Sequence, residues 1–380
     1  MSDGTLPRKA ATGLKILIVK LSSLGDVVHA MPAVQDIRRA LPDAHIDWVV
    51  ETAFADLVRR CEGVSRVLPL ELRRWRRAPW AAETRQAVTA FRALLREEAY
   101  DRVIDLQGLT KSALVAWAAR LAPGGHRVAL GNRTSGSSFE APTRWVAHQA
   151  VYIPPRIHAV DRGRVLCAHA LDYAPDGPQL FGLRAVASAN SDTNSGAKSS
   201  AISSAISSAM PSAIPSVGGG DTEAAATGSV DAAPNAARPE VALVHGTSRD
   251  DKLWPEAHWV ALGQALQARG LALGLPHGSD AELARAERIA GALGAGAQVW
   301  PRLALGELAD RLAGCAGVVG VDSGLSHIAT ALDLPHVQIY NHDTAWRTGP
   351  VGRARQRSVF AQPHPGLEAV LAAWDEVSAA

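Results

Sequence analysis

The segment KILIVKLSSLGDVVHAMPA, Lys15–Ala33, combines a short apolar strand, a polar loop with one glycine and an apolar helical stretch. The second half of the chain repeats this plan in GVVGVDSGLSHIATAL, Gly317–Leu332. A strand that leads through a polar loop into a helix is the opening of a βαβ unit, in which the strands are parallel. The two segments therefore predict two parallel, helix-covered sheets, each with ligand-binding loops at the carboxyl ends of its strands.

The flanking sequence continues this alternation of short apolar runs and longer helical patterns. In the first half we expect strands at residues 15–20, 45–50, 66–70, 102–106, 126–130 and 150–153, and helices that include residues 33–41 and 81–98. In the second half we expect strands at residues 241–245, 271–275, 298–300, 317–321 and 336–340, and helices that include residues 256–269, 281–293 and 305–313. The sequence thus predicts an α/β protein with two doubly wound domains and a cleft between them.

Residues 185–239 differ in composition from both halves. This segment has no aromatic residue, 15 of its 55 positions are Ala and 12 are Ser, and a four-residue repeat runs from Ser200 to Pro215. Such a composition buries too little apolar surface to offset the entropy of ordering the chain. We therefore predict a flexible linker at residues 185–239, between domains at residues 1–184 and 240–380.

The charge is unevenly distributed along the 380 residues. The net charge is +2, but residues 1–184 hold 26 Lys and Arg against 18 Asp and Glu, whereas residues 185–380 hold 13 against 19. A basic first half favours an anionic partner, such as a phosphorylated substrate, a membrane surface or a nucleic acid.

Cysteine spacing and hydropathy indicate the cellular compartment. Cys61, Cys167 and Cys315 are too far apart in sequence for a disulfide framework or a zinc motif. No apolar run reaches the roughly 18 residues that span a bilayer, and the segment Met1–Leu14 lacks the apolar core of a signal peptide. We therefore expect a cytoplasmic protein rather than a secreted or integral membrane protein.

The loop Lys20–Asp26 follows the first predicted strand. It lacks the spacing G-x-G-x-x-G, which argues against a nicotinamide dinucleotide site. Asp26 lies where the chain enters a helix, so it can be a capping or first-turn carboxylate, or a general base at a cleft. The spacing alone favours the capping role.

Loops of the second half carry residues suited to a phosphate or a ribose. At Asp322–Gly324, backbone N–H groups at a helix N-terminus offer an anion site, although simple helix capping uses the same geometry. Thr247, Ser248 and Lys252 can bind phosphate oxygens, and Glu282 can accept hydrogen bonds from ribose hydroxyls. The alternative for these four residues is an ordinary polar loop or first-turn role.

The basic residues of the first half include the cluster RRWRR at Arg73–Arg77, together with Lys111, His158 and Arg162. Arginine forks suit carboxylates and phosphates, although such clusters are also common on solvated surfaces. Nucleic-acid binding is a rival use of the cluster, but no nucleic-acid-binding module accompanies it.

Taken together, these stretches resemble the lipopolysaccharide heptosyltransferase family over both halves of the chain. The segments that carry the resemblance are Lys15–Ala33, Asp47–Glu51, Arg73–Arg77, Val103–Leu114, Thr247–Trp259 and Val321–Asp333. The pattern Lys-x-Ser-Ser-x-Gly-Asp in the first loop resembles the members that add the first heptose. Residues 185–239 are an insertion relative to the family, and Gly131–Thr143 matches poorly, so acceptor contacts there stay unassigned.

The resemblance implies a GT-B fold and an inverting glycosyltransferase. The enzyme would move L-glycero-D-manno-heptose from ADP-heptose to the Kdo of Kdo2-lipid A in lipopolysaccharide core biosynthesis. No cofactor or metal is implied, because Asp250 and Asp251 are adjacent and no D-x-D motif occurs. The anionic inner leaflet would be a further partner, with the protein peripheral on the cytoplasmic face of the inner membrane.

The resemblance also assigns roles to individual residues. Asp26 would be the catalytic base, and Lys252 would stabilise the leaving group. The donor would be bound by Thr247, Ser248, Lys252, Glu282, Asp322, Ser323, Gly324 and His327. The acceptor would be bound by Ser23, Arg73, Arg74, Arg76, Arg77, Lys111, His158 and Arg162.

Three alternatives differ in what they require of the chain. A heptosyltransferase that acts at a later core position would need an acceptor that already carries heptose. A sugar-nucleotide epimerase with the same fold would convert the donor without an acceptor and would have no use for the Arg73–Arg77 cluster. A noncatalytic phosphosugar- or lipid-binding protein would bind ligand without releasing ADP.

Overall fold

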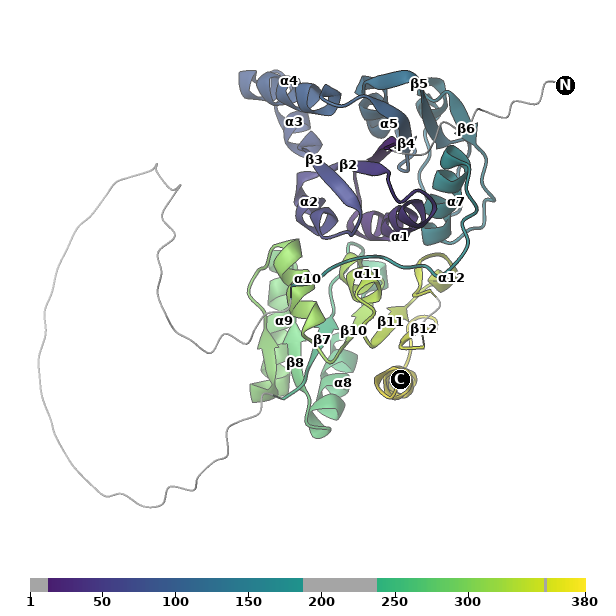
Figure 1. The fold of residues 1–380 in the computed structure, drawn as a ribbon. Helices are drawn as coiled ribbons and strands as arrows, with labels where there is room; N and C mark the ends of the chain where they lie inside the picture. Colours follow the sequence, from purple (N-terminus) through teal and green to yellow (C-terminus); the bar gives the residue numbers. More distant parts are fainter. Residues whose placement is uncertain (1–12, 187–237, 352–353) are drawn as a thin grey trace, which may run out of the picture. The chain divides into compact units, whose positions relative to one another are not determined.

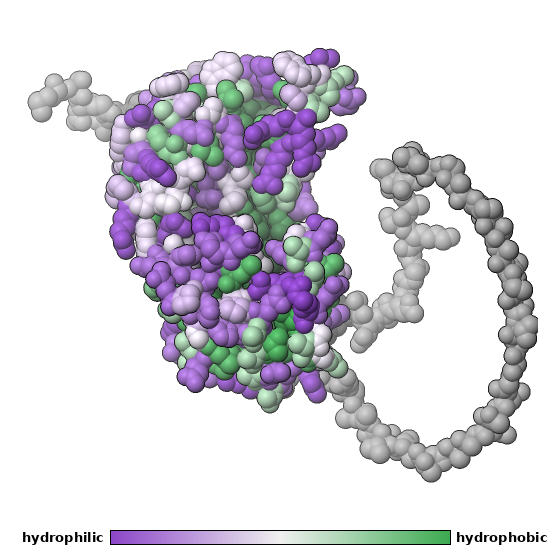
Figure 2. All heavy atoms as spheres, turned by 180° about the vertical axis from the view of Figure 1, so that it is seen from behind, coloured by the Kyte–Doolittle hydropathy of each residue, from purple (hydrophilic) through white to green (hydrophobic). Residues whose placement is uncertain are grey.

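A computed structural model describes residues 13–186, 238–351 and 354–380, which belong to one compact unit (Figure 1). The predicted linker, residues 185–239, lies outside the described residues except at its ends, so its flexibility and the domain boundaries stay predictions. No helix in the described part of the chain is long and apolar enough to cross a membrane. The visible face in Figure 2 is largely hydrophilic, with hydrophobic residues in separate groups.

The first half forms a sheet of six parallel strands in the order β3-β2-β1-β4-β5-β6. The strands are β1 Lys15–Val19, β2 His45–Glu51, β3 Val64–Leu70, β4 Tyr100–Asp105, β5 Leu121–Leu130 and β6 Gln149–Val151. The helices are α1 Leu24–Ala40, α2 Thr52–Arg59, α3 Leu72–Arg77, α4 Ala82–Arg96, α5 Thr110–Ala118, α6 Pro142–Val146 and α7 Ala159–Leu171.

The second half forms another sheet of six parallel strands in the order β12-β11-β10-β7-β8-β9. The strands are β7 Glu240–Val244, β8 Ala272–Leu275, β9 Ala297–Val299, β10 Gly317–Val321, β11 His336–Tyr340 and β12 Gln356–Phe360. The helices are α8 Glu256–Ala268, α9 Asp280–Leu293, α10 Leu305–Ala313, α11 Gly324–Ala331, α12 Ala345–Thr348 and α13 Leu367–Ser378, with short 3₁₀ turns at Asp250–Lys252 and Gly294–Gly296.

Helices cover both faces of each sheet because the strands are apolar on both faces (Figure 1). In β1, Ile16 and Ile18 pack with residues of α1, α2 and α7, whereas Leu17 and Val19 pack with residues of α4 and α5. In β7, Val244 packs with residues of α10 and α11, whereas Leu243 packs with residues of α8, α9 and α13. Side chains that alternate across a strand thus build a core on each face of the sheet.

The expected strands all occur within a few residues of their predicted bounds, and the structure adds β12, which the sequence analysis did not predict. The first helix begins at Leu24, so Asp26 lies in its first turn as predicted, and the helix includes residues 33–40 of the predicted helical stretch with Pro32 inside it. Proline removes one helical N–H donor, which makes it a poor helix-interior residue. Here Pro32 is buried between Met31 and Ala33, so packing offsets the lost hydrogen bond.

A buried ion pair joins α7 to α1. The Arg164 Nε donates to Asp36 Oδ2 at 2.6 Å, and both side chains are almost fully buried. We expect Arg164→Met to lower the free energy of unfolding by about 3–5 kcal/mol, because it leaves the Asp36 carboxylate buried with a weaker partner. Urea denaturation measures this. Arg59→Met removes an exposed pair with Asp56 and should cost less than about 1 kcal/mol; equal losses in the two variants would contradict the assignment.

Candidate active site

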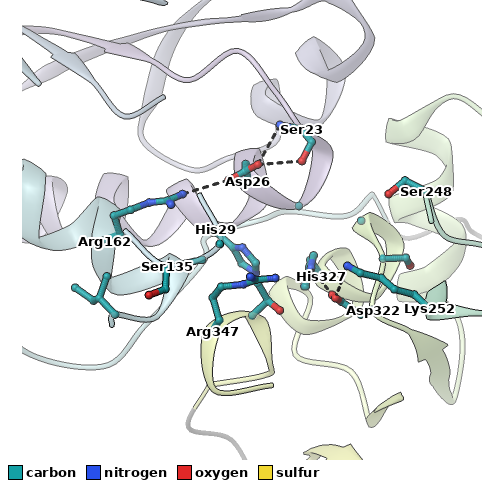
Figure 3. A pocket seen from close by; sticks show the side chains of 17 residues that line it. Ser23, Asp26, His29, Ser135, Arg162, Ser248, Lys252, Asp322, His327 and Arg347 are labelled. Carbon is teal, nitrogen blue, oxygen red and sulfur yellow. Dashed lines mark hydrogen bonds and ion pairs between the residues drawn. The ribbon is translucent and has the colours of Figure 1, made fainter. Parts of the chain in front are cut away.

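Loops from the two halves of the unit line one cavity of ≈ 180 Å³. The N-terminal ends of α1 and α11 both reach it, as expected for carboxyl-end loops of parallel sheets. Figure 3 shows the side chains. The lining residues are Ser23, Gly25, Asp26, His29, Ser135, Gly136, Ile157, Ala159, Arg162, Ser248, Lys252, Asp322, Ser323, Gly324, His327, Arg347 and Thr348.

Two glycines let the helix N-termini approach each other closely. A Cβ atom built on Gly25 would lie 2.6 Å from the His327 ring, and one built on Gly324 would lie 2.6 Å from a Leu24 methyl group. Real Cβ atoms do not approach other atoms this closely, so a side chain at either position would push α1 and α11 apart. Glycine is therefore required at both positions for Asp26 and the α11 N-terminus to share one cavity.

Four donors surround the Asp26 carboxylate, and Figure 3 shows those of Ser23 and Arg162. Its Oδ1 accepts from Lys20 Nζ and Arg162 Nη2, each at 3.2 Å. Its Oδ2 accepts from the Ser23 backbone N–H at 3.3 Å and the Ser23 hydroxyl at 3.0 Å. The contacts with Ser23 make Asp26 the first-turn partner in a capping box whose N-cap residue is Ser23, so the capping role is present in the structure.

The cations around Asp26 determine its protonation. Burial alone would raise the pKa of the Asp26 carboxyl, but Lys20 and Arg162 outweigh this effect and hold the pKa well below its ordinary value. Lys20 is nearly fully buried, and burial lowers the pKa of its ammonium group. Asp26 is therefore ionised at neutral pH, and two cationic side chains contact its Oδ1.

A group of histidines lies beside this carboxylate. The rings of His29 and His327 are 4.2 Å apart between centroids, and those of His29 and His158 are 6.1 Å apart. Burial lowers the pKa of all three side chains, and for His29 the proximity of the other two rings lowers it further. The cluster is therefore neutral at physiological pH, which keeps the contact between α1 and α11 free of like-charge repulsion.

On the α11 side, the Lys252 ammonium donates to Asp322 Oδ2 at 2.6 Å. The buried Asp322 carboxylate also lies 3.6 Å from His327 Nε2. Ser323 is the N-cap residue of α11 but makes no side-chain capping hydrogen bond. The first-turn N–H groups of α11 and the Lys252 cation thus face one side of the cavity, an arrangement suited to an anion such as a phosphate.

Nine predicted site residues line the cavity: Ser23, Asp26, Arg162, Ser248, Lys252, Asp322, Ser323, Gly324 and His327. Thr247 and Glu282 do not line it. The Thr247 hydroxyl donates to the Asp322 carbonyl at 2.9 Å, and the Glu282 carboxylate packs on Gly246 and accepts from the Gly278 N–H at 2.6 Å. Thr247 therefore lies beside the lining residues Ser248 and Asp322, whereas Glu282 lies in the first turn of α9.

The remaining predicted acceptor residues lie at the edge of the cavity or farther out. His158 caps α7 and its Nε2 is 3.1 Å from the Gly349 carbonyl. Lys111 donates to the Ser22 hydroxyl at 3.1 Å, one residue from Ser23. Arg73, Arg74, Arg76 and Arg77 are exposed on α3.

The sequence analysis did not single out His29, Ser135, Gly136 or Arg347. His29 lies one turn after Asp26 on α1, so helical spacing from Asp26 is the signal that could have found it. Gly136 has φ +70°, and the Arg347 guanidinium occupies the space that a side chain there would need. Ser135 and Gly136 belong to the unassigned stretch 131–143, and Arg347 lies on α12, a helix too short to predict.

Buried histidines make the stability depend on pH. Burial lowers the pKa of His245 and of His327 to about 4, and that of His336 to about 3. Below the ordinary value of 6.5, the unfolded chain binds protons that the folded state does not, so the free energy of unfolding falls as the pH falls towards 4. Each group contributes up to about 1.4 kcal/mol per pH unit.

Urea denaturation across this pH range tests the effect. The variant His336→Gln should show a shallower pH dependence than the wild type, because one of the buried histidines no longer titrates. The exposed His169→Gln serves as the matched control and should keep the wild-type slope. Identical slopes in all three proteins would contradict the origin assigned to the pH dependence.

Two Rossmann-like halves whose loops share one cavity form a GT-B fold, the architecture of one class of glycosyltransferases. The model of glycosyltransferase family 9 (heptosyltransferase) matches residues 88–366. Lipopolysaccharide heptosyltransferase 1 of Pseudomonas aeruginosa is 36% identical over 90% of this chain and 82% of its own length. That of Escherichia coli K12 is 35% identical over 90% of this chain and 92% of its own length.

Solved structures agree with these sequence relatives. Escherichia coli heptosyltransferase WaaC with ADP has a TM-score of 0.75 and 30% identity, and covers 96% of this chain and 100% of its own. WaaC with ADP-2-deoxy-2-fluoro heptose has a TM-score of 0.69 over 96% of this chain and 98% of its own. The chain belongs to glycosyltransferase family 9, the heptosyltransferases, and is a glycosyltransferase with the GT-B fold. That it needs no metal or cofactor stays a prediction.

Proposed function

We propose that the chain transfers L-glycero-D-manno-heptose from ADP-heptose to the Kdo of Kdo2-lipid A, with inversion at the anomeric carbon. The observation that carries this proposal is the cavity into which one half places a carboxylate and the other places a cation at a helix N-terminus. Displacement of a nucleotide at a sugar carbon needs both: a base for the attacking hydroxyl, and positive charge for the departing phosphate.

The donor is held by the second half. The relative WaaC has been solved with ADP and with a fluorinated ADP-heptose. This chain belongs to the heptosyltransferase family, which supports ADP-heptose as its donor. In this chain the diphosphate faces Lys252, Ser248 and the N–H groups at Ser323–Gly324. The charge that develops on the leaving ADP is stabilised by this ammonium group and by the positive end of α11.

The acceptor is held by the first half, with its hydroxyl at Asp26. The carboxylate takes the hydroxyl proton while the new glycosidic bond forms and the bond from the anomeric carbon to ADP breaks. Because Lys20 and Arg162 hold the pKa of Asp26 low, Asp26 is a weak base in the unliganded site. An acceptor carboxylate that pairs with Arg162 raises the pKa of Asp26 and makes it a stronger base, because it draws one of the two cations away from Oδ1.

The amphiphilic acceptor places the reaction at a membrane. Kdo2-lipid A carries acyl chains, so we propose that the enzyme works as a peripheral protein at the anionic cytoplasmic face of the inner membrane. The exposed arginines of α3 and Lys111 at the start of α5 support this, because they form the basic edge of the acceptor side.

Acceptor choice separates this proposal from its close alternative. Purified protein and ADP-heptose are incubated either with Kdo2-lipid A or with the same lipid already carrying one heptose, and the products are analysed by mass spectrometry and NMR. We expect heptose addition to the first acceptor only, with an anomeric configuration opposite to that of the donor. Addition only to the heptosylated acceptor would assign the enzyme to a later core position, and a retained configuration would exclude a single displacement.

A further inference from the structure

The basic excess of the first half is confined to one segment. Residues 72–156 hold 14 Lys and Arg against 6 Asp and Glu, whereas the rest of residues 1–184 holds 12 of each. The same segment contains the described aromatic side chains that are most exposed: Trp80 at 86%, Trp145 at 79%, Tyr152 at 67% and Trp117 at 61%. Exposed tryptophan and excess positive charge therefore occur together.

Most of these side chains belong to one helical layer. Phe91 of α4 and Val115 of α5 pack in the core on one face of the first sheet, and Trp75 of α3 and Val146 of α6 pack against it. The outward side of this layer carries Trp80 between α3 and α4, Leu114 and Trp117 on α5, and Trp145 on α6. We call Trp80, Leu114, Trp117 and Trp145, with the exposed arginines of α3 and α4, the tryptophan–arginine face.

This face adjoins the acceptor side of the cavity. Lys111 and Leu114 lie one turn apart on α5, and the Lys111 ammonium contacts Ser22 beside the cavity residue Ser23. Burial raises the pKa of Glu51 at the end of β2, and the nearby Arg73 and Lys111 cations oppose this shift. The first residues of α3 and α5 therefore meet at the carboxyl edge of the sheet, between the tryptophan–arginine face and Asp26.

We propose that the tryptophan–arginine face binds the surface of an anionic lipid bilayer, with its tryptophan rings at the headgroup level and its arginines on lipid phosphates. Tryptophan is enriched at that depth because its ring is apolar and its N–H is polar, and basic residues are attracted to anionic leaflets. A second copy of the chain fits less well, because an isologous contact would bring two faces of the same positive charge together.

The role of this face in catalysis rests on the proposed function. A lipid acceptor keeps its acyl chains in the bilayer, so its sugar must reach Asp26 while the enzyme lies on the membrane surface. A docking face beside the acceptor edge of the cavity shortens that path. Binding to vesicles that contain no acceptor is nevertheless a separate measurement, so it can succeed or fail independently of catalysis.

Vesicle cosedimentation of the full chain tests the proposal. Vesicles of equal parts phosphatidylcholine and phosphatidylglycerol are compared with vesicles of phosphatidylcholine alone. We expect binding to the anionic vesicles that is weakened by salt, and a loss of about tenfold or more in affinity for the double variant Trp117→Ser/Trp145→Ser. Arg85→Gln/Arg92→Gln on α4 should weaken binding to anionic vesicles. Leu180→Ser/Phe360→Ser, which removes exposed apolar side chains outside the segment, should bind as the wild type does.

Activity supplies the second readout. The double tryptophan variant should keep wild-type turnover on a deacylated, water-soluble acceptor but lose turnover on acceptor embedded in vesicles. The proposal is overturned if the wild type does not bind anionic vesicles, if the tryptophan variant binds them as the wild type does, or if the wild type is a dimer that this variant converts to monomers. Vesicle binding without heptose transfer would support the docking face and reject the proposed function.

Discussion

Asp26→Asn is expected to lower turnover by about 10²–10⁴-fold while leaving ADP affinity near that of the wild type. The amide cannot accept the proton of the attacking hydroxyl, and Lys252 and the α11 N-terminus, which face the donor, are unchanged. Single-turnover kinetics with saturating ADP-heptose and acceptor measures the loss. Near-normal turnover in a folded variant would remove Asp26 from the role of base.

The same substitution also disturbs the fold locally. Lys20 is almost completely buried and would lose its carboxylate partner, so Asp26→Asn should lower the melting temperature. Asp26→Glu is the companion variant, because it keeps the negative charge beside Lys20 and Arg162 but moves the carboxylate by one methylene. We expect this variant to be more stable than Asp26→Asn and still strongly impaired in turnover. Ser23→Ala, which removes one hydroxyl donor from Oδ2, should have a much smaller effect on turnover.

Lys252→Ala is expected to lower kcat by about 10²–10³-fold and to weaken ADP binding. The ammonium group lies beside the anion site at the α11 N-terminus, where the leaving diphosphate gains charge. Lys252→Arg should recover part of the activity, because it keeps the cation in a different geometry.

Lys111→Ala gives a matched control for this second prediction. Its ammonium group contacts Ser22 on the acceptor side, so its loss should raise the KM for acceptor and leave ADP binding unchanged. Isothermal titration with ADP, together with initial rates at varied acceptor concentration, distinguishes the two lysines. A Lys252→Ala variant with normal kcat and normal ADP affinity would contradict the assignment of the donor side.

Sequence patterns predicted the two sheets because central strands such as Lys15–Val19 and Gly317–Val321 are apolar on both faces. They missed β12, an edge strand whose middle residues are exposed. Its pairing with β11 decides its structure, and a short sequence window contains no information about that pairing.

The candidate site could be predicted in part. Asp26, Lys252 and Ser323–Gly324 lie in the segments that follow β1, β7 and β10, so the topology brings these segments to the carboxyl edges of the sheets. The approach of Gly25 to His327 depends on how α1 packs against α11, and nothing in either local sequence reveals it. Of the donors around Asp26, Lys20 and Ser23 lie in the same loop as Asp26, whereas Arg162 comes from α7, so its low pKa depends in part on the fold.

The most direct test of the account is ADP release by the purified full chain given ADP-heptose, with and without Kdo2-lipid A. We predict release that depends on the acceptor, together with a gain of one heptose in the mass of the acceptor. Release at the same rate without acceptor, or no release from folded protein with either mixture, would contradict the account.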